Sequence, residues 1–143
     1  GDILYNLEST GLHTNGYSLV NKLVKGDEEE EILQLLCNSH KCYMSDVKKI
    51  RERIDVHGLC HITGGGIKEN IPRILPSNLT AVFEKIKFPK VFDWIKREGK
   101  VSEDEMLRVF NCGIGMIVIG DSESEGAMNE LGYKRIGYIK KKS

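Results

Sequence analysis

The sequence predicts an α/β protein, an α+β layered sandwich in which helices pack against a mixed sheet of about four to six strands. Segments typical of strands alternate with segments of helical periodicity along most of the chain. The 143 residues suit one domain, and a domain of this size buries enough surface for a core without disulfides. No internal repeat, long linker or low-complexity stretch interrupts the alternation.

Five short apolar segments predict the strands of this sheet. The clearest are "DILYNL" and "GMIVIG", where aliphatic residues gather over the length of a strand. A longer segment, "LTAVFEKIKF", shows partial alternation and is rich in residues that favour strands. The expected strands are residues 2–7, 57–62, 79–88, 115–120 and 133–139.

Apolar residues at helical spacing predict the helices of the first half of the chain. The spacing is clear in residues 17–25, and Gly26 follows as a candidate C-cap. The acidic run "DEEEE" before "ILQLLCNSH" is typical of a solvated helix start, where carboxylates favour the helix dipole. A metal-binding acidic patch is the alternative. Ser45 is expected to cap a helix over residues 46–54.

The later helices carry their own start signals. Pro72 fits the first turn of a helix that begins near Asn70. Ser102 and Glu105 form a capping box, in which each side chain serves the backbone of the other. The later helices are expected from residue 70 to residue 75 and over residues 90–99, 102–110 and 122–132.

Charge and hydropathy argue against nucleic acid and membranes as partners. Lys plus Arg number 21 and Asp plus Glu number 21, so no global basic field attracts a polyanion. No apolar run approaches the ~20 residues that a membrane helix needs, and no signal peptide opens the chain. The chain begins Gly1-Asp2 without an initiator methionine, and we expect it to be part of a longer protein.

The cysteines are expected to be reduced thiols in a cytoplasmic protein, because their spacing matches no disulfide framework. They are Cys37, Cys42, Cys60 and Cys112. A zinc site is the alternative, since cysteine and histidine are zinc ligands. Two groups lie close in sequence: Cys37 with His40 and Cys42, and His57 with Cys60 and His61. We expect no metal site, because these spacings fit no common zinc finger.

Three consecutive glycines, Gly64, Gly65 and Gly66, stand between a strand segment and a helix start in "HITGGGIKENIPR". Glycine loses the most conformational freedom on folding, so such a run is kept where side chains would obstruct a close approach. The backbone N–H groups of such a turn can bind phosphate, and Arg73 could add a bidentate contact. A tight turn without a ligand is the alternative, because the pattern is neither a Rossmann fingerprint nor a P-loop.

Two further glycine loops are candidates. His13 lies in "STGLHTNGYS", a polar loop of the kind where ligand contacts gather, although a single loop histidine is more often a surface or hydrogen-bonding residue. In "FNCGIGM", Gly113 and Gly115 precede a buried strand, where a bulge or close packing is the simpler interpretation. Asn111 is then expected to be a turn residue that tolerates the left-handed region.

These loops, taken together, resemble a known family. In this order, "GDILYNLESTGLHTNGYSLV", "HGLCHITGGGIKENIPRILP" and "FNCGIGM" closely resemble the C-terminal half of the phosphoribosylaminoimidazole synthetases. These are the aminoimidazole ribonucleotide synthetases, or phosphoribosylformylglycinamidine cyclo-ligases, of purine biosynthesis. The resemblance runs from Gly1 to about Ile119, and more loosely to the last strand.

The resemblance implies an ATP-dependent cyclo-ligase that converts formylglycinamidine ribonucleotide to aminoimidazole ribonucleotide. In that reaction the γ-phosphate of ATP activates an amide oxygen, and an amidine nitrogen then closes the ring. The resemblance implies a homodimer of two-domain chains in which residues 1–143 form the C-terminal domain. An N-terminal domain, absent from this chain, would supply most of the ATP and Mg²⁺ contacts, so we expect the chain to be inactive alone.

The resemblance also implies roles for individual residues. His13 and Asn15 are the implied catalytic residues, which would orient the amidine or stabilise the phosphorylated intermediate. The residues implied to line the nucleotide and substrate groove are Thr14, Gly16, Gly64, Gly65, Gly66, Asn70, Arg73, Asn111, Gly113 and Gly115. No general base is implied.

One segment departs from the family pattern. Residues 38–50, "NSHKCYMSDVKKI", stand where the family has a "PT.IYVK"-like sequence, of which Tyr43 survives. Two alternatives to the cyclo-ligase are open, and the altered segment is the sequence hint for the second of them. The first is a domain of a related ATP-dependent enzyme, such as formylglycinamidine ribonucleotide synthetase, selenophosphate synthetase or thiamine-monophosphate kinase. The second is a non-catalytic module that binds a nucleotide or a partner protein.

Overall fold

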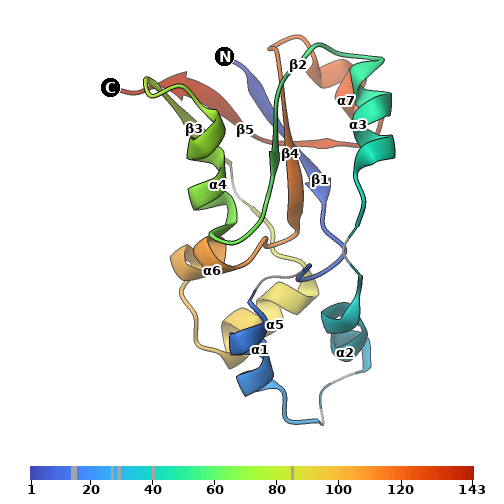
Figure 1. Ribbon diagram of the computed structural model, residues 1–143, viewed down its shortest axis with the longest axis vertical. Helices are drawn as coiled ribbons and strands as arrows, with labels where there is room; N and C mark the ends of the chain where they lie inside the picture. The colour runs from blue at the N-terminus through green and yellow to red at the C-terminus, as the bar shows by residue number, and fades with distance from the viewer. Residues whose placement is uncertain (14–15, 27, 29, 40, 85) are drawn as a thin grey trace.

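The computed structural model describes residues 1–13, 16–26, 28, 30–39, 41–84 and 86–143. A central sheet carries helices on both faces, and a further group of helices lies beyond one end of it (Figure 1). The strands are β1 (Ile3–Glu8), β2 (Val56–His61), β3 (Leu79–Phe83), β4 (Ile114–Gly120) and β5 (Lys134–Lys141). The helices are α1 (Tyr17–Leu23), α2 (Glu30–Cys37), α3 (Met44–Arg51), α4 (Gly66–Ile74), α5 (Lys90–Glu98), α6 (Glu103–Val109) and α7 (Glu125–Glu130).

The sheet has the order β2-β4-β1-β5-β3, and the pairings between its described strands are antiparallel. The predicted layered fold and the predicted number of strands are confirmed. Where a mixed sheet is expected from the sequence, the described strands form an antiparallel one. Each of the four pairs of described strands joins strands that are not consecutive in the chain, so the local sequence does not reveal their relative direction.

Alternation along the strands divides the core between the two faces. In β4, Ile117 faces α4, whereas Val118 faces α3 and α7 on the other side. Ile71 of α4 and Ile50 of α3 are buried on these two faces. A third buried cluster, which includes Phe110, joins α1, α2, α5 and α6 beyond the end of the sheet. Both faces of the sheet are thus covered, and one of its ends rests on helices.

Two helices begin elsewhere than the sequence predicts. Helix α4 begins at Gly66, a turn before Asn70, because Gly65 takes a left-handed N-cap conformation with φ 93°. Pro72 therefore lies inside the helix rather than in its first turn. Helix α3 begins at Met44 with Tyr43 at its N-cap, so the prediction of Ser45 as the cap is wrong.

Other element ends follow from packing that the sequence pattern does not show. Gly26 is not the C-cap of α1, because the helix ends at Leu23 and the extended Val24 caps it. Strand β3 ends at Phe83, and Phe88 instead packs into the helical cluster. The prediction of Ser102 as a cap is confirmed, since its Oγ accepts a hydrogen bond from Glu105 N at 3.2 Å. In the described part of the chain, no helix has the length and apolarity to cross a membrane.

Candidate functional site

Three loops meet at one end of the sheet, where β1 and β2 end and β4 begins (Figure 1). Strand β4 lies between the other two and is antiparallel to both. Glu8, the last residue of β1, therefore lies opposite Ile114. His61, the last residue of β2, lies opposite Met116. The register brings together the described parts of the three loops that the sequence indicates: the His13 loop (residues 9–13 and 16), the glycine turn (63–66) and the Asn111 loop (110–113).

Asn111 joins two of these loops. Its Nδ2 donates to Gly11 O at 2.8 Å, and its Oδ1 accepts from Ser9 Oγ at 2.8 Å and from Gly113 N at 2.9 Å. The side chain is 2% exposed, so its polar atoms form hydrogen bonds within the protein. The expectation that Asn111 takes the left-handed conformation is wrong, because the positive φ of 53° belongs to Cys112. Asn111 is a residue that positions the loops.

Asn70 has the same function in the glycine turn. Its Nδ2 lies 3.2 Å from Thr63 O, 3.2 Å from Gly64 O and 2.7 Å from Gly66 O. Its Oδ1 accepts from Thr63 Oγ1 at 2.9 Å. The carbonyl groups of the turn are thus held inward by one buried amide. The N–H groups of Gly64 and Gly65 donate to no acceptor among the described residues.

The shape of the turn itself requires glycine. Gly65 and Gly66 have φ values of 93° and 60°, in the left-handed region that side chains disfavour. A Cβ at Gly66 would also overlap the carbonyl group of Leu107 in α6. Glycine at these two positions is therefore explained by the protein alone. What a ligand could use is the pair of N–H groups at Gly64 and Gly65, which have no acceptor among the described residues.

Arg73 lies in the last turn of α4, about 10 Å along the helix axis from its first residue. The side chain is exposed, and its Nη2 lies 3.8 Å from Glu69 Oε2. Arg73 is thus on the helix that the turn begins, but it is not part of the turn.

His13 is a buried residue and not a surface one. Its side chain is 3% exposed, its backbone is left-handed with φ 57°, and its Nε2 accepts from Thr10 N at 3.2 Å. The ring lies edge-on to Tyr43 with 6.3 Å between the centroids. Thr14 and Asn15, the next two predicted site residues, lie outside the described residues.

The remaining glycines of these loops are closely packed. Gly16 has φ 82° and lies against the ring of Phe110, and Gly113 has φ 89° and lies against Pro89. A side chain at either position would overlap these rings. Both glycines therefore help to hold the loops on the helical cluster.

Tyr43 links these loops, a structural role that the sequence motifs do not indicate. Its hydroxyl group donates to Glu8 O at 2.8 Å, and its ring lies edge-on to both His13 and His61. The hydroxyl group occupies the space that a Cβ of Gly115 would need. Burial raises the pKa of Tyr43 well above its ordinary value, so the phenol remains protonated. Its survival in an otherwise altered segment is the one sequence signal that points to it.

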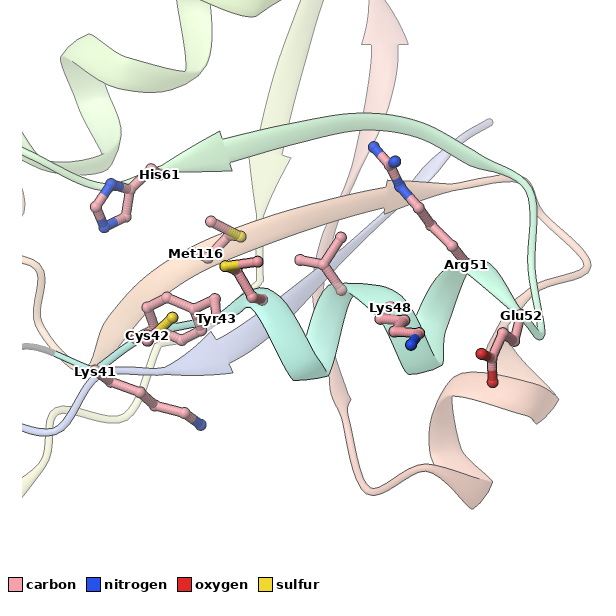
Figure 2. A pocket seen from close by; sticks show the side chains of 10 residues that line it. Lys41, Cys42, Tyr43, Lys48, Arg51, Glu52, His61 and Met116 are labelled. Atoms are coloured by element: carbon pink, nitrogen blue, oxygen red, sulfur yellow. The ribbon is translucent and has the colours of Figure 1, made fainter.

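Two pockets flank the loop cluster. One, of about 680 Å³, lies between α3 and the strands β2 and β4 (Figure 2). The other, of about 620 Å³, is partly lined by Ser9 and Gly113 of the predicted loops. Lys41 lines both pockets. The second pocket has further cationic residues that sequence reasoning misses, because they come from distant segments: Lys87, Lys134 and Arg135.

Metal ligands do not gather in the part of the chain that the structure describes. No group of three or more His, Cys, Asp or Glu residues lies close enough there to hold an ion. Cys60 is buried on the α4 face, and His57 forms an ion pair with Asp2, with 2.7 Å between Nδ1 and Oδ2. His40 of the other candidate zinc group lies outside the described residues. All four cysteines are free thiols.

Fold and site together define a class: an α/β sandwich domain that gathers three glycine-rich loops at one end of an antiparallel sheet. The whole chain, residues 1–143, matches the family model for the AIR synthase related protein, C-terminal domain. The chain belongs to this family.

Curated relatives agree with that assignment. The chain is 41% identical over 142 residues to a phosphoribosylformylglycinamidine cyclo-ligase of Cupriavidus pinatubonensis, covering 92% of this chain and 41% of the relative. It is 39% identical to the protein of that name from Nitrosococcus oceani, covering 92% and 40%. It is 37% identical to that of Neisseria meningitidis, covering 92% and 41%. The chain thus spans about two fifths of the length of these relatives.

Proposed function

We propose that this chain is the C-terminal domain of a phosphoribosylformylglycinamidine cyclo-ligase. The complete enzyme would use ATP to convert formylglycinamidine ribonucleotide to aminoimidazole ribonucleotide in purine biosynthesis, in the cytoplasm. The observation that carries the proposal is the meeting of the three family motifs at one end of the sheet. The family match over residues 1–143 and the names of the relatives support it.

The glycine turn would bind an anionic group of the substrate or nucleotide. Its carbonyl groups are turned toward Asn70, and the N–H groups of Gly64 and Gly65 are left for a ligand at the start of α4. A phosphate is favoured there by the N–H groups and by the helix dipole. Asn70 and Asn111 would position the loops and not contact the ligand, because their amide groups are already bonded.

The His13 loop would act on the reacting part of the substrate. We assign His13 and Asn15 to orienting the amidine or stabilising the phosphorylated intermediate, and Thr14 and Gly16 to binding the nucleotide or substrate. Arg73, Gly113 and Gly115 would border the groove. The geometry makes His13 suited to this, because burial and the bond from Thr10 N fix its ring.

ATP and Mg²⁺ would be held mainly by an N-terminal domain, which would also form most of a homodimer contact. This chain would add the N–H groups of Gly64 and Gly65, which have no acceptor among the described residues. Two alternatives are a related ATP-dependent enzyme and a non-catalytic module. Neither is favoured, because the relatives named above share the cyclo-ligase name.

The test is to express the full-length gene that contains this chain in a purine auxotroph that lacks the synthetase. We expect growth without added purine. A full-length protein that is folded and well expressed but gives no rescue would refute the proposal. The isolated chain should bind ATP weakly, and micromolar binding by calorimetry would place the main nucleotide site on this domain instead.

A matched pair of histidine variants tests the site within the full-length enzyme. His13→Gln should lower kcat at least ~100-fold, the effect of losing a group that stabilises developing charge. His57→Gln, at the opposite end of the sheet, should keep the activity. Equal activities of the two variants would remove His13 from the proposed machinery.

A further inference from the structure

The pocket between α3 and the strands β2 and β4 lies beside the loop cluster and has no part in the proposed reaction. Its volume of about 680 Å³ falls within the range of small-molecule sites. Figure 2 shows Met116 on β4, His61 at one end and Arg51 reaching across from the last turn of α3. Met44 of α3 also lines the pocket. The pocket therefore has an apolar part and a cationic part.

The apolar part suits a flat heteroaromatic ring. Met44 is 80% exposed, which is unusual for a large apolar side chain, and it lies over the pocket with Met116 and Val47. The rings of Tyr43 and His61 close this end. Methionine sulfur makes favourable contacts with aromatic rings, and unbranched methionine adapts to their shape.

The cationic part suits a phosphate group. Arg51 and Lys48 line the pocket, and within the described residues neither forms an ion pair with a carboxylate. A guanidinium group can hold two phosphate oxygens at once. Glu52 is the carboxylate among the lining residues, and it extends away from Arg51 in Figure 2. Positive charge thus exceeds negative charge at this end.

The two parts are separated by the length of a small nucleotide. Tyr43 caps the start of α3 and Arg51 ends it, a span of about 12 Å at 1.5 Å per residue. The wall from Lys41 to Met44 also falls in the segment where this sequence departs from the family pattern.

We propose that this pocket binds a purine nucleoside monophosphate. The purine ring lies against Met44 and Met116 beside His61, and Arg51 binds the phosphate, with Lys48 adding to the positive field. The proposal does not depend on cyclo-ligase activity, since the site shares no reacting group with the glycine turn.

The experiment is a titration of the full-length protein, labelled with ¹³C-methyl methionine, with AMP. Four methionines of this chain serve as reporters: Met44 and Met116 in the pocket, and Met106 and Met128 in the core. Substitutions of single methionines by leucine assign the signals. We expect saturable shifts of the Met44 and Met116 methyl signals, with those of Met106 and Met128 unmoved.

Ligand and protein variants test the two parts separately. Adenosine and UMP should each bind at least tenfold more weakly than AMP, because one lacks the phosphate and the other the purine. Arg51→Gln should weaken AMP binding at least tenfold, whereas Arg53→Gln, outside the pocket and paired with Glu130, should change it less than twofold.

Three results would overturn the proposal: no shift of Met44 or Met116 at millimolar AMP, equal binding of AMP and UMP, or equal affinity of the Arg51 and Arg53 variants. Because activity is not measured, an inactive enzyme that still binds AMP here would refute the proposed function and support this site. An active enzyme without binding would do the reverse.

Discussion

Replacing Asn70 by alanine should destabilise the protein more than substitutions near an exposed turn usually do. The side chain is 5% exposed and lies within hydrogen-bond distance of three carbonyl groups and one hydroxyl group of the glycine turn. Its two amide hydrogens can serve two carbonyl groups well at a time, so about three bonds are lost at ~1 kcal/mol each. Thr63 and Gly64 are exposed, and water would replace part of this loss. We expect a loss of about 2–3 kcal/mol.

Urea denaturation, followed by the fluorescence of the single buried Trp94, measures this loss. At a typical slope for a small domain, the midpoint should fall by roughly 1–2 M urea. Asn78→Ala, in an exposed turn before β3, is the matched control and should change stability by less than ~0.5 kcal/mol. Asn70→Asp keeps the acceptor for Thr63 and loses the donors, so it should be at least as unstable as the alanine variant.

A loss no greater than that of the control would refute the reasoning. It would mean that water replaces the amide group at all three carbonyls, and that the turn keeps its shape without Asn70. The lack of an acceptor for the Gly64 and Gly65 N–H groups among the described residues would then need another cause.

Three further predictions concern glycine, pH and thiols. Gly66→Ala should lower the free energy of unfolding by at least ~2 kcal/mol, because φ of Gly66 is 60° and Leu107 O occupies the space of the added Cβ. Gly126→Ala, which has open space in α7, should instead stabilise the protein by ~0.5–1 kcal/mol, and equal effects of the two variants in urea melts would contradict this. The hydrogen bond from His57 to Asp2 raises the pKa of His57 in the folded state, so the stability that this pair contributes is present at low pH and disappears as pH rises through that pKa. The wild type should be more stable than Asp2→Asn at pH 5.5 but not at pH 8, and a difference that stays constant with pH would argue against the His57–Asp2 pair. Burial raises the pKa of Cys112 to about 12, so iodoacetamide at pH 8 should label the exposed Cys37 and Cys42 in the native protein and Cys112 only after unfolding, as mass spectrometry would show.

Local chemistry explains which elements the sequence predicts well. The cap of α6 is predicted because Ser102 and Glu105 interact across one turn of the same helix. Strand β4 is predicted because both of its faces are buried, which leaves a continuous apolar run. The start of α4 is missed because it depends on the left-handed Gly65 and on Asn70, whose side chain closes the turn from within the helix.

The candidate site also has features that the sequence predicts and features that it does not. Its three loops are visible in sequence as glycine-rich motifs, but the sequence does not distinguish residues that contact a ligand from residues that hold a loop. Asn111 illustrates this, since its hydrogen bond to Gly11 spans 100 positions of the chain. Tyr43 and the cationic residues of the second pocket are also brought to the loops only by folding.

The amino-acid sequence is enough to predict the layered α/β fold, the positions of most strands and helices, the motif order that marks the family, and the absence of a charge bias. These properties depend on composition and on periodicities of a few residues. The tertiary structure alone decided that the three loops share one end of the sheet, because β4 pairs with both β1 and β2 from distant parts of the chain. It also decided that Asn70 and Asn111 face inward, and that α3 and the strand edge enclose a pocket. Such contacts join residues far apart in sequence, so no local pattern records them.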